Sequence, residues 1–180
     1  MPQVVAFLRA INVGGHIVTM DELRKLFVKM GLDGVETFIA SGNVVFDTRA
    51  RGAALEKKIE TVLEKALGYE VKTFLRTGAE IAAIGEFKPF TPKQWAAGLT
   101  KVVGLLAAPL GKDAHGALMK LRSATDDFHV NGREIYWSST LGQSDSKISN
   151  VLLERTLKVS TTFRGINTMH RLVAKYDFTA

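Results

Sequence analysis

Cysteine is absent from this sequence of 180 residues. Its absence excludes disulfides, thiolate metal sites and cysteine nucleophiles, and it leaves no sign of an oxidising compartment. Long apolar runs are absent as well, so the sequence predicts neither a membrane-spanning helix nor a membrane partner. The short apolar run after Met1 has no basic flank and no small-residue cleavage pattern, which argues against a signal peptide. We therefore expect a cytoplasmic location.

Acidic residues are fewer than basic ones, and the imbalance is uneven along the chain. The sequence has 24 Lys and Arg against 18 Asp and Glu, a formal charge of +6, and its 46% of hydrophobic residues can form a compact core. Up to Lys88 the basic and acidic residues number 12 and 11, whereas after it they number 12 and 7. The excess therefore lies in the second half, where an anionic partner such as nucleic acid would make contact.

The first half has the residue pattern of a split βαβ unit. Thr19 and Glu22 form a capping box at the start of one helix, and Gly31 stands at its end. Thr77 and Glu80 form a second capping box for a short helix. The expected elements are a strand at 3–9, a helix from 20, strands at 35–40 and 44–46, a helix at 55–66 and a strand at 71–75.

The second half repeats this order of elements without a visible repeat of residues. Its expected elements are a strand at 101–106, a helix at 113–121, a hairpin of 128–130 with 134–137 across Asn131-Gly132, a helix around 148–155, a strand at 159–164 and a last helix capped by Asn167 or Thr168. Pro89 and Pro92 interrupt the pattern between the halves. The sequence therefore predicts an α+β fold of two ferredoxin-like, split βαβ subdomains in tandem with mostly antiparallel sheets. We expect the first subdomain at 1–88, a linker at 89–98, and a basic subdomain at 99–180.

Several motifs along the chain carry a family resemblance. They are Phe7–Gly15 (FLRAINVGG), Ser41–Phe46 (SGNVVF), Arg76, Ser146–Ser149, and Arg164 with Asn167-Thr168. With these motifs the chain resembles the domain of unknown function 1697 family, which is found widely in bacteria. Ala10 takes the place of the family's usual glycine, and Gly165-Ile166 take the place of its Asn-Trp. The resemblance implies a two-part α+β fold and no established activity, so function has to be argued from the residues.

Arg9, Asn12, Gly14 and Gly15 lie between the first strand and the first helix, in a segment that we call the anion loop (Arg9–Gly15). A glycine-rich turn brings backbone N–H groups close to an anion, and an arginine can bind two of its oxygens at once. The pattern predicts phosphate binding, but it is neither the Walker motif nor the dinucleotide fingerprint. The alternative is that the glycines shape a turn while Arg9 and Asn12 bind backbone groups.

Ser41, Gly42 and Asn43 form the turn of the first hairpin and offer a hydroxyl and an amide to a ligand. The same residues are ordinary in tight turns, so a purely structural role is the alternative. In a split βαβ unit the first and third strands are neighbours, and antiparallel pairing places the end of the first beside the start of the third. We therefore expect this turn and the anion loop to share one edge of the sheet.

A second candidate site lies in the basic C-terminal stretch. It comprises Lys147, Arg164, Asn167, Thr168 and Arg171. Lys147 is electrostatically unfavourable near a helix start, and Arg164 with Asn167 precede another helix start, where an anion would be welcome. The alternative is a solvated basic face with a capping asparagine. The four histidines have no metal-ligand spacing, so we expect neither a metal nor a cofactor.

Three functions are consistent with these residues. The first is a non-catalytic binding module for a phosphate-bearing ligand, either a small molecule or nucleic acid. The second is a small phosphoryl-handling enzyme with an acylphosphatase-like anion loop, in which Arg9 would stabilise phosphoryl oxygens and Asn43 would orient water. The third is a structural or protein-interaction module.

Overall fold

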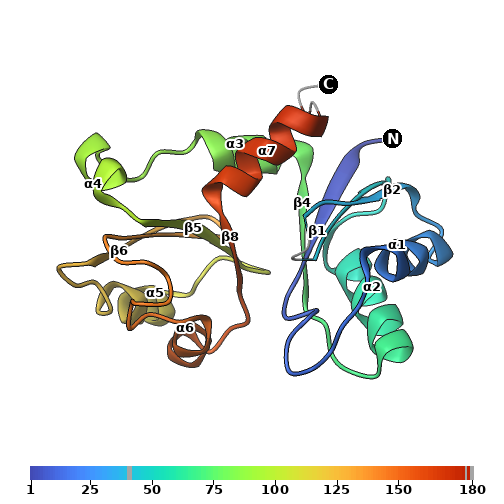
Figure 1. The fold of residues 1–180 in the computed structure, drawn as a ribbon, viewed down its shortest axis with the longest axis horizontal. Coiled ribbons are helices and arrows are strands. Elements are labelled where there is room, and N and C mark those ends of the chain that lie inside the picture. The colour runs from blue at the N-terminus through green and yellow to red at the C-terminus, as the bar shows by residue number, and fades with distance from the viewer. Residues whose placement is uncertain (40–41, 177, 179–180) are drawn as a thin grey trace. The chain divides into compact units, whose positions relative to one another are not determined.

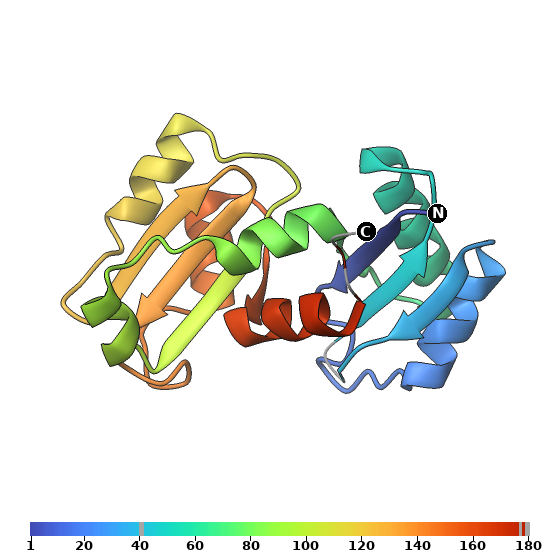
Figure 2. The same cartoon turned by 90° about the horizontal axis from the view of Figure 1, so that it is seen from above.

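Two four-stranded antiparallel sheets make up the protein (Figures 1 and 2), as seen in a computed structural model that describes residues 1–39, 42–176 and 178. Residue contacts group the chain into two compact units, Met1–Ala82 with the described part of Leu172–Ala180, and Ala83–Arg171. Each unit contains the series strand, helix, strand, strand, helix, strand. The predicted α+β fold with two ferredoxin-like subdomains in tandem is therefore confirmed.

The first unit has its two long helices on one side of its sheet (Figure 2). Its elements are β1 (Gln3–Leu8), α1 (Met20–Lys29), β2 (Asp33–Thr37), β3 (Asn43–Asp47), α2 (Gly52–Leu67) and β4 (Thr73–Thr77), with the sheet order β2-β3-β1-β4. Alternate residues of β1, Val4, Ala6 and Leu8, are buried in one core with Phe27 of α1 and Ile59 of α2. The core therefore fills the space between this sheet and the two helices.

Both predicted capping boxes of the first half are present. Glu22 N donates to Thr19 Oγ1 at 3.2 Å, and Thr19 N donates to Glu22 Oε2 at 2.9 Å. Thr77 and Glu80 form the same pair of bonds, at 3.2 and 2.8 Å, at the start of α3 (Gly78–Glu86). In both places the reciprocal bonds satisfy backbone N–H groups that a helix start would otherwise leave free.

The second unit builds the same arrangement, with α5 and α6 on one side of its sheet (Figure 1). Its elements are β5 (Thr100–Leu105), α5 (Lys112–Met119), β6 (Asp126–Asn131), β7 (Glu134–Ser139), α6 (Asn150–Leu157) and β8 (Thr162–Gly165), with the sheet order β6-β7-β5-β8. Leu118 of α5, Leu153 of α6 and Trp137 of β7 lie in its core. The hairpin turn falls one residue later than predicted, because Asn131 still pairs with Glu134.

Two segments differ from their predictions or leave them open. The predicted linker contains α4 (Pro92–Ala97), a short helix with its own Thr91–Gln94 capping box, and the domain boundaries at 88 and 99 stay a prediction. The last helix, α7 (Ile166–Tyr176), begins before Asn167. The prediction that Asn167 or Thr168 caps it is therefore wrong, because both lie inside its first turn.

The two sheets repeat one another in register as well as in order. Arg76 of β4 pairs with Val5 of β1, and Arg164 of β8 pairs with Val103 of β5. Both arginines are buried, with 0% and 8% of their surface exposed. Each donates from Nη1 to the carbonyl oxygen of the residue before it, at 2.8 and 3.0 Å. The similarity of the two units thus extends to the position and backbone contact of one buried arginine per sheet.

The next pair along the same strands shows how the packing differs. In the first sheet Ala6 pairs with Leu75, and in the second Gly104 pairs with Phe163. A Cβ atom at Gly104 would lie 2.6 Å from Cζ of Phe163. Because interiors are close-packed, the larger ring on one strand requires the smaller residue on its neighbour.

Candidate functional site

The end of β1 and the start of β3 lie side by side, as predicted. The two strands pair antiparallel, and Leu8 N donates to Gly42 O at 2.8 Å. Gly42 has φ +80°, and a Cβ atom there would lie 2.8 Å from Cγ2 of Ile11, so the turn needs glycine at this point. The anion loop and the hairpin turn therefore share one edge of the sheet, while Ser41 lies outside the described residues.

The two asparagines at this edge hold the backbone in place. Asn12 Oδ1 accepts from Val18 N at 2.8 Å and so closes the loop ahead of α1. Asn43 is fully buried, and its Nδ2 donates to Phe38 O at 2.8 Å. One polar atom of each side-chain amide thus binds the backbone, as expected if these residues have a structural role. Asn43 is buried and offers no surface to a ligand.

The glycines and the arginine of the anion loop are placed differently. Gly14 and Gly15 are exposed at φ +68° and +86°, and a Cβ atom on either would meet nothing within 4 Å. Arg9 is half-buried, and its backbone N donates to Lys72 O at 2.9 Å. This part of the loop therefore presents backbone to solvent next to a half-buried arginine, and backbone N–H groups and a guanidinium are the groups that bind an oxyanion.

Aromatic and hydroxyl contacts fasten the anion loop to the segment after α2. Tyr69 OH donates to Ile11 O at 2.7 Å, and the Tyr69 ring stacks on His16 with centroids 3.8 Å apart. Burial raises the pKa of the Tyr69 hydroxyl, which keeps it protonated as a donor. These residues carried no sequence signal, because the contact joins positions 58 residues apart.

Backbone strain is concentrated at the same edge. Among the described residues, three other than glycine have positive φ: Ala10 at +54°, Ile39 at +60° and Lys158 at +56°. Lys158 ends α6, where a left-handed residue is common. Ala10 lies in the anion loop and Ile39 in the hairpin loop, and for a β-branched residue such a φ is unusual. Strain of this kind is often retained where a binding site needs a particular backbone shape.

The basic C-terminal stretch is divided by the fold. Lys147, Asn167 and Arg171 are exposed and Thr168 is half-buried, whereas Arg164 is buried with 8% exposure. Arg164 Nη1 also donates to Thr162 Oγ1 at 2.8 Å, and burial lowers the pKa of its guanidinium to about 10. Arg164 therefore presents little surface to a ligand, because it is buried and its Nη1 donates to protein oxygens.

The family-like segment Ser146–Ser149 has structural contacts that the sequence did not predict. Ser146 Oγ donates at 2.9 Å to Asp126, a buried carboxylate that also accepts from Trp137 Nε1 at 2.9 Å. Burial alone would raise the pKa of Asp126, but hydrogen bonds from Thr125, Trp137 and Ser146 outweigh it and hold that pKa below its usual value. Ser149 caps α6 by accepting from Leu152 N. This segment therefore fixes a loop in the second unit.

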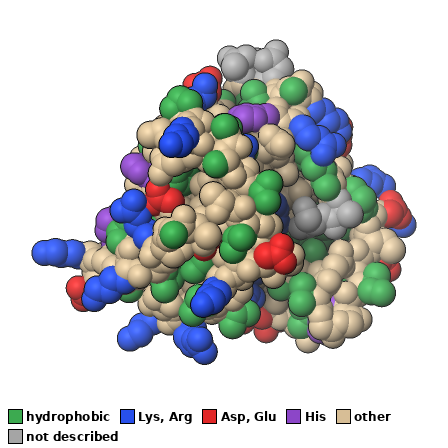
Figure 3. Space-filling model, turned by 60° about the vertical axis from the view of Figure 1, so that its left-hand side comes forward, with side chains coloured by type: hydrophobic (Ala, Val, Ile, Leu, Met, Phe, Trp, Pro, Cys, Tyr) green, Lys and Arg blue, Asp and Glu red, His purple; other side chains and the backbone are tan. Residues whose placement is uncertain are grey.

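The second unit contains the excess of basic residues that the sequence counts give, and a basic binding surface stays a prediction. Residues Ala83–Arg171 have 12 Lys and Arg against 7 Asp and Glu. On the face seen in Figure 3, Lys and Arg side chains outnumber Asp and Glu and are interspersed with histidine. Within the described residues, no group of three or more His, Asp or Glu has the geometry of a metal site. None of the described helices is long and apolar enough to cross a membrane.

Comparisons with known proteins place the fold but assign no activity. A family model described as "Protein of unknown function (DUF1697)" matches residues 1–136. The conserved bacterial protein SP0830 from Streptococcus pneumoniae has a similar structure, with a TM-score of 0.71 and 24% sequence identity over 97% of this chain and 99% of that one. No curated protein matches the chain. At this identity the likeness concerns the fold.

Proposed function

We propose that this chain, which belongs to the DUF1697 family of proteins of unknown function, is a non-catalytic binding module for a small phosphate-bearing ligand. The ligand would bind at the edge of the first sheet where the anion loop and the hairpin turn meet. Arg9 would bind phosphate oxygens through its guanidinium, and the backbone N–H groups around Gly14 and Gly15 would complete the site.

The observation that carries this proposal is the strain at Ala10 and Ile39 in two loops that lie at one edge. A left-handed residue other than glycine costs roughly 1–2 kcal/mol, so the two loops keep an unfavourable backbone shape. Gly14 and Gly15, by contrast, leave open space in front of the backbone. Strained loops around an accessible backbone are what a preformed anion site would require.

Phosphoryl transfer is less well supported than binding. An acylphosphatase-like mechanism would need Asn43 to orient water, but this side chain is fully buried and donates to Phe38 O. The N-terminus of α1 is also occupied, because Thr19 and Glu22 form its capping box. The anion would therefore depend on the loop itself, and the buried Asn43 side chain is poorly placed for the role that catalysis would give it.

Nucleic acid is the less favoured partner for a similar reason. Sheets that recognise RNA stack bases on exposed aromatic side chains. Here Val5, Phe7 and Val45, which face away from the helices of the first unit, are all 0% exposed. Nucleic acid would have to bind through charge alone, and such binding would weaken steeply with salt.

Calorimetric titration of the full chain with pyrophosphate and with ATP tests the proposal. We expect binding that Arg9→Gln weakens by about tenfold or more, the usual loss for a charged hydrogen bond. Arg24→Gln, on the exposed face of α1, should change the affinity less than about twofold.

Absence of binding to both probes at millimolar concentration would overturn the proposal, as would equal binding by the Arg9 variant. A titration with a single-stranded RNA tests whether nucleic acid is the partner instead. If the RNA binds strongly, with an affinity that falls as salt is added and that Arg9→Gln leaves unchanged, the protein would be a nucleic-acid-binding module instead.

A further inference from the structure

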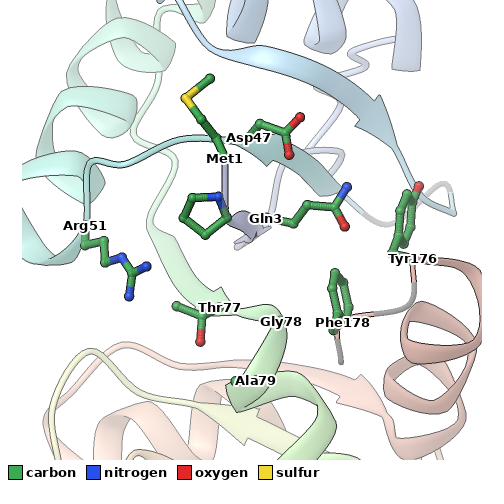
Figure 4. Close-up of a pocket in the computed structure, with 10 residues that line it drawn as sticks. Met1, Gln3, Asp47, Arg51, Thr77, Gly78, Ala79, Tyr176 and Phe178 are labelled. Carbon is green, nitrogen blue, oxygen red and sulfur yellow. The ribbon is translucent and has the colours of Figure 1, made fainter. Parts of the chain in front are cut away.

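A cavity of the first unit lies at the start of β1, the strand end opposite to the anion loop (Figure 4). Its volume is about 400 Å³, within the range of small-molecule sites. The residues that matter chemically are Gln3, Asp47, Arg51, Thr77, Tyr176 and Phe178. They come from β1, β3, the start of α2, the end of β4 and the end of α7, all within the first unit.

Asp47 brings an uncompensated negative charge to this cavity. No hydrogen bond or ion pair joins its half-buried carboxylate to another described side chain. Asp33 stands opposite it in the pairing of β2 with β3, and like charges in directly opposed positions are unfavourable. The carboxylate lies over Gly34, which has φ +55° and no room for a Cβ atom beside Asp47 Oδ2. The cavity thus holds a carboxylate that forms no ion pair with another described side chain.

Arg51 brings an uncompensated positive charge to the same cavity. It occupies the N-cap position of α2, where its side chain makes no capping bond. A cation is unfavourable there, because the helix N-terminus carries a partial positive charge. No ion pair links Arg51 to Asp47 or to another described carboxylate. Two opposite charges therefore line one cavity without neutralising each other.

The opposite wall of the cavity is aromatic (Figure 4). The rings of Tyr176 and Phe178 stack with centroids 5.9 Å apart and an interplanar angle of 18°. Tyr176 OH donates to Glu36 Oε2 at 2.8 Å, which directs its polar end to β2. Phe178 lies against Gly78, where a Cβ atom would come 2.6 Å from Cγ of the ring. These contacts hold an apolar surface beside the charged groups.

We infer that this cavity binds a zwitterion with an apolar side chain, of the size of an amino acid or a dipeptide. Its ammonium group would bind Asp47 and its carboxylate Arg51, and both charges of the ligand would relieve an unfavourable charge of the protein. Its side chain would lie on the rings of Tyr176 and Phe178. The inference is independent of the anion loop, since the two sites share no residue.

Titration of the full chain with L-phenylalanine and with glycyl-L-phenylalanine tests this inference. We expect at least one of them to bind, and the stronger one identifies the size of the natural ligand. Two analogues separate the charges: 3-phenylpropionate lacks the ammonium group and 2-phenylethylamine lacks the carboxylate. Each should bind at least about tenfold more weakly than phenylalanine if the amino acid is the ligand.

Variants assign each charge to its partner. Asp47→Asn should weaken binding of the zwitterion by about tenfold and leave the affinity for 3-phenylpropionate unchanged, because that analogue has no ammonium group. Arg51→Gln should also weaken binding of the zwitterion by about tenfold, but it should leave the affinity for 2-phenylethylamine unchanged, because that analogue has no carboxylate. Arg49→Gln, an exposed arginine two residues away that does not line the cavity, is the matched control. Far-UV circular dichroism checks that each variant is folded. The inference is overturned if neither zwitterion binds at 10 mM, a concentration about ten thousand times a micromolar Kd. It is also overturned if phenylalanine binds more tightly than the dipeptide but 3-phenylpropionate binds the wild type as tightly as phenylalanine does.

Discussion

Replacing Ala10 by glycine should stabilise the protein, because Ala10 holds a backbone angle of φ +54° that suits glycine. The left-handed conformation costs an L-residue roughly 1–2 kcal/mol. Glycine does not have this conformational cost. Its greater freedom in the unfolded chain, however, lowers the free energy of unfolding by about 0.4–1 kcal/mol. The difference leaves a net gain of about 0.5–1 kcal/mol, which in a chain of this size is a rise in Tm of about 2 °C.

Urea denaturation followed by circular dichroism measures this gain as a shift of the midpoint with an unchanged slope. Ala107→Gly is the control: Ala107 is exposed, lies outside the helices and strands and does not have positive φ, so glycine there should lower stability. If Ala10→Gly destabilises the chain as much as the control does, the reasoning from backbone angle is refuted.

Two further predictions concern single hydrogen-bonding groups. Asp126→Asn should cost about 1–3 kcal/mol at neutral pH. Because the pKa of Asp126 is lower in the folded than in the unfolded chain, its carboxylate contributes its full stabilisation above the unfolded pKa near about 4 and loses it as the pH falls through the folded pKa. The difference in unfolding free energy between variant and wild type should therefore shrink below about pH 4. A constant difference in urea titrations from pH 3 to 7 would contradict this. Tyr69→Phe removes the bond to Ile11 O and should cost about 1 kcal/mol and weaken pyrophosphate binding, whereas unchanged affinity would mean that Tyr69 does not shape the anion loop.

Local spacing in the sequence was enough to predict the elements and their order. The capping residues Thr19 and Thr77 bond to partners three residues away, so their contacts can be read directly from the chain. The edge shared by the anion loop and the hairpin turn also follows from the sequence, because a split βαβ unit fixes which strands are neighbours. Strand limits were less accurate, and β4 and β8 begin two or three residues later than predicted.

Burial of polar side chains could not be predicted in the same way. Arg164 looks like a surface cation in the sequence, and only the pairing of β8 with β5 brings it inside. Asn43 looks like a turn residue that is open to a ligand, but the nearby carbonyl of Phe38 takes its amide. The cavity with Asp47 and Arg51 was missed because its walls come from segments at both ends of the chain.

The shared register of the two sheets has an evolutionary consequence. A gene half as long, encoding one sheet with one buried arginine, could give rise to this chain by duplication and fusion. In such a history substitutions at Gly104 and Phe163 would be coupled, since a larger residue at Gly104 requires a smaller one at Phe163. The excess of basic residues belongs to one half alone, so the two halves share a fold and a buried arginine but differ in the charge they offer to a partner.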